Sequence, residues 1–168
     1  VQIADLLHVT NSVGGCAAAG SAAYFCEYAV SEIENSDLYG DDAASRRQLL
    51  LRGGLTITTT MDPAKQAAAD AAVQAYVPTG DPSNVKAALV SVEPGTGRVL
   101  AIAQNTNYGD ATPEDPTATQ ISLGVDANHG GVENSKGTSG FQPGSTFKGF
   151  VLAEWYQEGR SGYTSFNT

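Results

Sequence analysis

Two serines in this chain lie three residues before a lysine, and this spacing suits acyl-transfer chemistry. The pairs are Ser83/Lys86 and Ser145/Lys148. A lysine amine that has lost its proton can accept the proton of a nearby serine hydroxyl, which makes that hydroxyl a nucleophile. Ordinary residue usage produces the bare Ser-x-x-Lys tetrad about once in a chain of this length, so the surroundings must decide which pair can react.

The surroundings of Ser145 and Lys148 fit this chemistry. Pro143-Gly144 predicts a turn that delivers the serine to the first turn of a helix, where unpaired N–H groups and the helix dipole favour negative charge. Residues three apart share one face of that helix. A free lysine has a pKa of about 10.4, which burial lowers, and the apolar cover expected for it comes from Phe147, Phe150, Val151 and Leu152. The alternative is a buried helix-capping serine beside a lysine that reaches out to solvent.

The surroundings of Ser83 and Lys86 do not fit. Pro, Gly and Asp residues precede this pair, and a strand is expected from Ala87 onward. Side chains three apart on a strand point to opposite faces. This pair therefore predicts a loop serine and an exposed lysine.

Four elements are expected to position Ser145. The β-branched residues 53–60 predict a strand. Asp62 and Pro63 are a typical N-cap and first helical residue, and they predict a helix that continues to Tyr76. Residues 87–93 and 98–104, separated by Pro94-Gly95-Thr96-Gly97, predict an antiparallel hairpin. The nucleophile helix is expected to continue to Glu158, with Gly159 as its C-cap.

The N-terminal 52 residues predict helical and irregular structure, with a break at residues 40–42. Cys16 and Cys26 are the only cysteines and lie ten residues apart, which favours a local disulfide and an oxidising compartment. Two buried thiols are the alternative. His8 and His129 do not complete a metal-ligand spacing, so no metal is expected.

Composition excludes several classes of protein. The chain is 41% hydrophobic and 16% charged, which is typical of a folded domain rather than a disordered one. Its net charge of −9 and scattered basic residues argue against nucleic acid binding. The acidity is most simply explained by solubility. No apolar stretch is long enough to span a membrane and no signal peptide is visible, so we expect any anchor to lie in an N-terminal segment outside this sequence.

The segment Phe141-Gln142-Pro143-Gly144-Ser145-Thr146-Phe147-Lys148 resembles the active-site segment of bifunctional (class A) penicillin-binding proteins. Three further segments, residues 24–30, 53–62 and 88–101, resemble in the same order the segments that precede it in that family. The resemblance implies an α/β (α+β) fold of the serine β-lactamase/transpeptidase type. It also implies a domain organisation in which residues 1–52 form a linker after a glycosyltransferase domain and residues 53–168 form the N-terminal part of a transpeptidase domain.

The family further implies a mechanism without a cofactor. Lys148 would take the proton of Ser145, and the serine would attack the D-Ala-D-Ala carbonyl of a peptidoglycan stem peptide. The backbone N–H of Ser145 would hold the developing oxyanion. An amine of a second stem peptide would then resolve the acyl-enzyme, and β-lactam antibiotics would acylate the same serine. The expected location is the extracytoplasmic face of the bacterial membrane.

The downstream motifs of the family are missing from this sequence. It contains no Lys-Thr-Gly strand, and Ser165-Phe166-Asn167 follows Ser145 too closely to be the family's Ser-x-Asn motif. We therefore expect an incomplete fold that needs the C-terminal remainder of the transpeptidase domain, in the same polypeptide or as a second, nicked chain.

Two other functions remain open from the sequence. One is a β-lactamase or D,D-carboxypeptidase on the same scaffold, which differs in that water resolves the acyl-enzyme. The other is a non-catalytic domain that binds or senses cell-wall peptides, which the missing downstream motifs favour.

Overall fold

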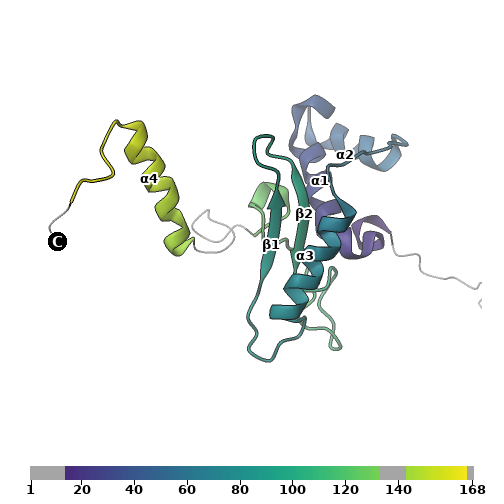
Figure 1. Ribbon diagram of the computed structural model, residues 1–168. Helices are drawn as coiled ribbons and strands as arrows, with labels where there is room; N and C mark the ends of the chain where they lie inside the picture. Colours follow the sequence, from purple (N-terminus) through teal and green to yellow (C-terminus); the bar gives the residue numbers. More distant parts are fainter. Residues whose placement is uncertain (1–13, 133–142, 166–168) are drawn as a thin grey trace, which may run out of the picture.

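The computed structural model describes residues 14–132 and 143–165 (Figure 1). The first thirteen residues of the expected linker, residues 141 and 142 of the active-site segment, and residues 166 and 167 of the Ser-x-Asn sequence lie outside these ranges. The α-helices and strands are α1 (Ala23–Asn35), α2 (Ala43–Arg52), α3 (Pro63–Tyr76), β1 (Ala88–Val92), β2 (Val99–Gln104) and α4 (Lys148–Gln157). The 3₁₀ helices are η2 (Gly15–Ala22), η3 (Asp37–Tyr39), η4 (Ala127–His129) and η5 (Gly144–Phe147).

Strands β1 and β2 form the antiparallel hairpin predicted from the sequence. Ala88 pairs with Gln104, and the register shifts between Ser91 and Val92, close to the turn. Gly95 and Gly97 in that turn have φ angles of +84° and +73°, which glycine adopts without steric cost. The local turn chemistry therefore determines where the hairpin folds back.

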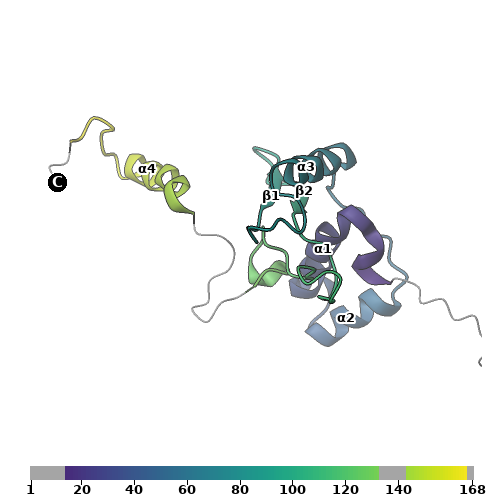
Figure 2. The same ribbon diagram turned by 90° about the horizontal axis from the view of Figure 1, so that it is seen from below.

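The hairpin has one helix on each face. Side chains alternate between the two faces of a strand. Ala101 and Ala103 of β2 pack against Ala69 and Val73 of α3, whereas Ile102 packs with aromatic residues of α1. Figure 2 shows α3 and α1 on opposite sides of the strands. The small alanine side chains allow α3 to approach the sheet closely, and the helix begins as predicted, with Asp62 accepting hydrogen bonds from the N–H groups of its first turn.

The side chain of Gln66 fills the outer edge of β2. Its Nε2 donates to the Ile102 carbonyl at 2.9 Å, and the Ile102 N–H donates to its Oε1 at 3.0 Å. A carboxamide thus reproduces the two hydrogen bonds that a third strand would make. Gln66 is 3% exposed and also donates to the Ser21 carbonyl of η2. One side chain therefore links α3, β2 and η2.

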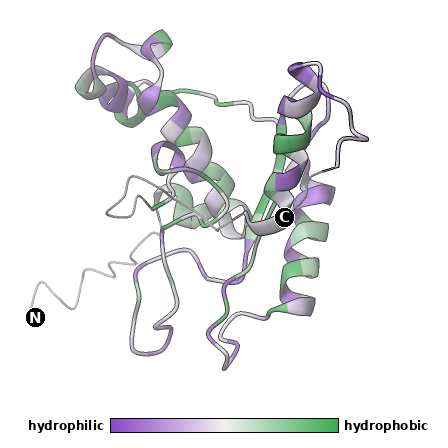
Figure 3. Ribbon diagram, turned by 90° about the vertical axis from the view of Figure 1, so that its left-hand side faces the viewer, coloured by the Kyte–Doolittle hydropathy of each residue, from purple (hydrophilic) through white to green (hydrophobic). Residues whose placement is uncertain are grey.

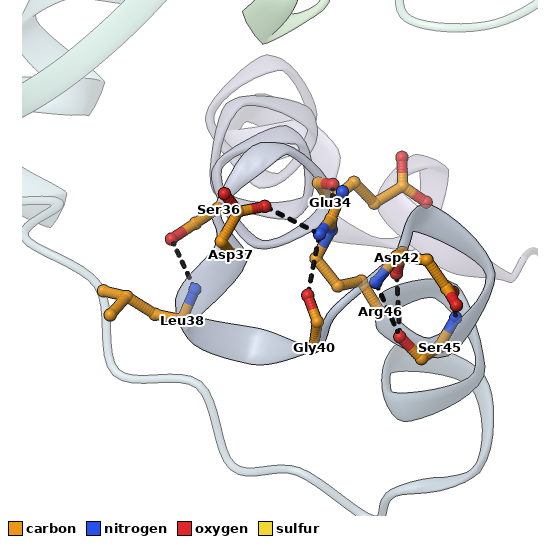
Figure 4. Close-up of polar contacts among 8 residues, drawn as sticks. All are labelled: Glu34, Ser36, Asp37, Leu38, Gly40, Asp42, Ser45 and Arg46. Atoms are coloured by element: carbon orange, nitrogen blue, oxygen red, sulfur yellow. Dashed lines mark hydrogen bonds and ion pairs between the residues drawn. The ribbon is translucent and has the colours of Figure 1, made fainter.

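Helices α1 and α2 meet at a corner held by Arg46 (Figure 4). Its guanidinium donates to the main-chain oxygens of Glu34 and Gly40 at 2.6 and 2.8 Å, and it pairs with Asp37 at 3.1 Å. Asp42 begins α2 with a capping box to Ser45. The predicted break at residues 40–42 is this corner, and the positive guanidinium stabilises the carbonyl end of α1.

The strand predicted at residues 53–60 is wrong. These residues form no strand, and Leu55 and Ile57 are exposed. Contact with the hairpin begins only at Thr60, whose Oγ1 donates to the Val99 carbonyl at 2.6 Å. High β propensity produces a strand only where a neighbouring edge supplies hydrogen bonds and packing, and the described residues offer none at this segment.

Cys16 and Cys26 form the disulfide predicted from the sequence, with an Sγ–Sγ distance of 2.05 Å, and it joins η2 to α1.

The helices carry both hydrophobic and hydrophilic residues (Figure 3). In the described part of the chain, no helix is both long and apolar enough to cross a membrane.

Candidate active site

Ser145 lies in a single 3₁₀ turn that continues directly into helix α4. Pro143 precedes this turn, and Gly144 has a φ angle of +53°. The N–H of Thr146 makes the first hydrogen bond of the turn, to the Pro143 carbonyl at 3.2 Å. The N–H of Ser145 precedes that bond and, like other first N–H groups of a helix, has no partner within the helix. The sequence Pro-Gly therefore produces the helix start that was expected from it.

Lys148 is the first residue of α4. Its N–H donates to the carbonyl oxygens of Ser145 and Thr146, so one 3₁₀ turn separates the serine from the lysine. Side chains three residues apart in a 3₁₀ turn eclipse one another. The backbone thus directs the Ser145 hydroxyl and the Lys148 amine to the same side of the helix.

The expected burial of Lys148 is not found among the described residues. Ser145 and Lys148 are both exposed, and the apolar residues expected to cover the lysine are exposed as well, with Phe150 at 68% and Val151 at 55%. Of the elements that the structure describes, α4 packs only against η5 (Figures 1 and 2). The sequence predicted that these apolar side chains would cover Lys148, whereas among the described residues they are exposed together with it.

Lys148 borders a hollow of about 410 Å³ between α4 and residues 161–164. Val151, Leu152 and Trp155 form most of its apolar wall. The Trp155 indole donates to the Ser161 carbonyl at 2.9 Å and so holds the following segment against the helix.

Ser83 is placed as the sequence predicted, in a turn. Its hydroxyl and its N–H both hydrogen-bond the Asp81 carboxylate, the N–H at 2.9 Å. These bonds lower the pKa of Asp81 and keep it ionised. The Ser83 hydroxyl is thus committed to a loop contact. Lys86 lies on the approach to β1 and is half-buried, so the prediction of an exposed lysine is wrong.

A polar cavity of about 250 Å³, which was not predicted from the sequence, has no lining residue in η5 or α4. It is lined by residues of η2, α1, α3 and β2 and by the segment after β2. Burial raises the pKa of Asp70 in its wall, and hydrogen bonds from Gln66 and Ser21 oppose that shift. The signal for this cavity in the sequence was Asp70, a carboxylate within the Ala-rich stretch of α3, four residues after Gln66.

The described residues contain no cluster of three or more His, Cys, Asp or Glu side chains that could hold a metal ion.

Comparison with known proteins places residues 87–168 in a family. Residues 87–168 match the family described as "Penicillin binding protein transpeptidase domain". Penicillin-binding protein 1A of Mycolicibacterium smegmatis is 38% identical over 112 residues, and penicillin-binding protein 1A of Mycobacterium tuberculosis is 36% identical over 112 residues. Each match covers 67% of this chain and 11% of the relative. No solved structure matches the chain significantly.

Through residues 87–168, which include β1, β2, η5 and α4, the chain belongs to the penicillin-binding protein transpeptidase family. The family predicted from the sequence is therefore confirmed. The predicted fold class is also confirmed, because helices and an antiparallel hairpin form part of the α/β fold of that domain. The predicted boundary between linker and transpeptidase domain at residues 52/53 stays a prediction. Tyr24 and Phe25, which precede that boundary, share a hydrophobic cluster with Ile102 of β2, which follows it.

Proposed function

We propose that this chain carries the nucleophile of a peptidoglycan D,D-transpeptidase, with Ser145 as the acylated residue and Lys148 as its base. The observation that carries the proposal is the position of the two residues. They lie one helical turn apart at the start of α4, within the residues that match the transpeptidase family.

The proposed chemistry has two half-reactions. The neutral amine of Lys148 takes the proton of Ser145 Oγ as that oxygen attacks the carbonyl between the two D-alanines of a stem peptide. The Ser145 N–H stabilises the negative oxygen of the tetrahedral intermediate. The C–N bond then breaks, and the terminal D-alanine leaves with a proton. An amine of a second stem peptide attacks the acyl-enzyme, which forms the cross-link and frees the serine. A β-lactam enters the first half-reaction as a substrate analogue.

The site is proposed to be completed by further sequence of the same transpeptidase domain. That further sequence would cover the exposed apolar residues of α4 and remove water from around Lys148. It would also supply the second oxyanion donor and the group that binds the substrate carboxylate. Residues 1–52 are proposed to join this domain to a glycosyltransferase domain. The protein is proposed to act at the outer face of the cytoplasmic membrane, held there by an N-terminal anchor.

Labelling with a fluorescent penicillin tests the proposal. The full-length protein that contains this chain should form a covalent adduct that survives denaturing electrophoresis, and Ser145→Ala should abolish it. Ser83→Ala is the matched control and should label normally, because the Ser83 hydroxyl is bound to Asp81. Label that appears and is then lost within minutes would support a β-lactamase instead. Absence of label on a folded protein would support a non-catalytic binding domain.

A further inference from the structure

The polar cavity between η2, α1, α3 and β2 has a lining that distinguishes it from the hollow beside Lys148. Its volume is about 250 Å³, and none of its lining residues belongs to η5 or α4. The lining includes two tyrosines and one carboxylate, Tyr24, Tyr108 and Asp70, and it includes no lysine, arginine or histidine. Such a lining favours a positively charged ligand over a phosphate or a carboxylate.

Hydrogen-bond donors in the wall are used within the protein. The Tyr24 hydroxyl contacts Thr106 Oγ1 at 2.8 Å and donates to the Thr119 carbonyl at 2.9 Å. Gln104 Nε2 donates to Thr106 Oγ1 at 2.6 Å and to the Ile121 carbonyl at 3.0 Å. The Tyr108 hydroxyl donates to Glu27 Oε2 at 2.8 Å. These bonds fix the wall in place and leave it few donors for a ligand.

Acceptors in the wall are less fully used. Asp70 Oδ1 accepts from Gln66 Nε2 at 3.2 Å, and the nearby Ser21 side chain also lowers the Asp70 pKa. Asp70 Oδ2 is shielded from solvent, and no described residue hydrogen-bonds to it. Asn107 donates through Nδ2 to Asp115 at 2.7 Å, which turns its amide so that Oδ1 is the remaining acceptor. Because Oδ2 is shielded, the Asp70 carboxylate would act on a ligand through its charge rather than through direct contact.

Several carboxylates lie near the two tyrosines of the cavity. Burial is the first cause of the raised pKa of both Tyr24 and Tyr108, and nearby carboxylates add to it, Asp115 for Tyr24 and Glu27 and Asp110 for Tyr108. The negative charges of these carboxylates, unlike burial, attract a cation into the same space. The rings of Tyr24 and Tyr108 lie edge to face with centroids 5.3 Å apart, and aromatic faces attract ammonium groups further.

We propose that this cavity binds a small organic ammonium ion, either an alkylamine or an amino sugar. The ammonium supplies the N–H donors that the wall lacks and the positive charge that the carboxylates favour. The cavity volume of about 250 Å³ lies below the range of about 300–1,000 Å³ for drug-sized ligands, so the ligand is expected to be as small as a short diamine or one sugar ring. The site is separate from the proposed transpeptidase chemistry, since its residues precede η5.

Two matched pairs of probes test this proposal by calorimetry on the full chain. Putrescine is compared with butane-1,4-diol, and glucosamine with N-acetylglucosamine. Each pair removes the positive charge, and in the first pair the size is nearly unchanged. At least one of the two amines should bind saturably, and the tighter one identifies the source of the ammonium. Its neutral counterpart should bind at least about tenfold more weakly, as expected when the attraction between the ligand's charge and the nearby carboxylates is lost.

Asp70→Asn should weaken binding of the amine by about tenfold or more, because it removes the charge while keeping the shape and the acceptor for Gln66. Asp81→Asn is the control, since it removes one carboxylate from an exposed turn outside the cavity. In the unsubstituted chain, the amine should also shift the ring NMR resonances of Tyr24 and Tyr108, which needs no variant to fold. Equal binding of charged and neutral probes, equal binding by Asp70→Asn, or no saturable binding of either amine would overturn the proposal.

Discussion

Replacement of Gln66 by methionine should destabilise the fold out of proportion to the size of the change. Methionine has a similar length and suits an apolar site, but it makes neither hydrogen bond to Ile102, whose N–H and carbonyl lie 3.0 and 2.9 Å from the glutamine amide. Ile102 is 1% exposed, so water cannot easily replace those bonds. Each buried backbone group left unpaired costs about 1–3 kcal/mol, and the two groups of Ile102 therefore predict a loss of about 2–6 kcal/mol.

Urea unfolding followed by circular dichroism measures this loss on the 168-residue chain. Gln74→Met is the matched control on the same helix. The Gln74 amide also uses both ends, with Thr79 at 2.9 Å, but at an exposed position where water replaces it. The control should lose less than about 1 kcal/mol. A Gln66→Met variant that is as stable as the control would refute the assignment of Gln66 as the edge cap of β2.

Three further predictions concern other parts of the fold. Arg46→Ala should lower the free energy of unfolding in urea by about 1.5–3 kcal/mol, because it removes charge-assisted hydrogen bonds to the Glu34 and Gly40 carbonyls. Arg47, whose side chain is 70% exposed, is the control, and Arg47→Ala should cost less than about 1 kcal/mol. Equal losses would contradict the role of Arg46. Burial raises the pKa of Asp70, so ionisation disfavours the folded state. Stability should therefore decline as pH rises from about 3.9, the ordinary aspartate pKa, through the raised value, and Asp70→Asn should show a smaller decline, measured as Tm against pH. Reduction of the Cys16–Cys26 disulfide, which spans ten residues, should lower stability by about 2–3 kcal/mol in the chain-entropy account; an unchanged denaturation midpoint with dithiothreitol would argue against that contribution.

Local signals in the sequence were sufficient for α3, the hairpin and the start of α4. Asp62-Pro63 contains both the cap and the first helical residue of α3, and the turn glycines of the hairpin need no distant partner. The strand prediction for residues 53–60 failed because strand formation depends on a sheet edge supplied from elsewhere in the fold. Propensity describes what a segment can form, and pairing decides what it does form.

The two polar features of the fold were harder to predict. Gln66 lies on the same helix face as Ala69 and Val73, so a glutamine in an apolar stripe was a visible signal. Its role depends on the position of Ile102, 36 residues later in the sequence. For the candidate active site, the sequence predicted the turn and the shared face of Ser145 and Lys148. It could not predict the exposure of Lys148, because burial depends on what packs against α4.

Peptide mass spectrometry of the penicillin-treated full-length protein tests the central claim most directly. After proteolysis, fragmentation of the peptide that spans residues 137–148 locates the adduct. The proposed function predicts one penicilloyl group on Ser145 and none on Ser83. It also predicts loss of the adduct in Lys148→Met, whose tryptic peptide spans residues 137–160 and still contains the serine. An adduct on a different residue, or an equal adduct yield in Lys148→Met, would contradict the assignment of Ser145 as nucleophile and Lys148 as its base.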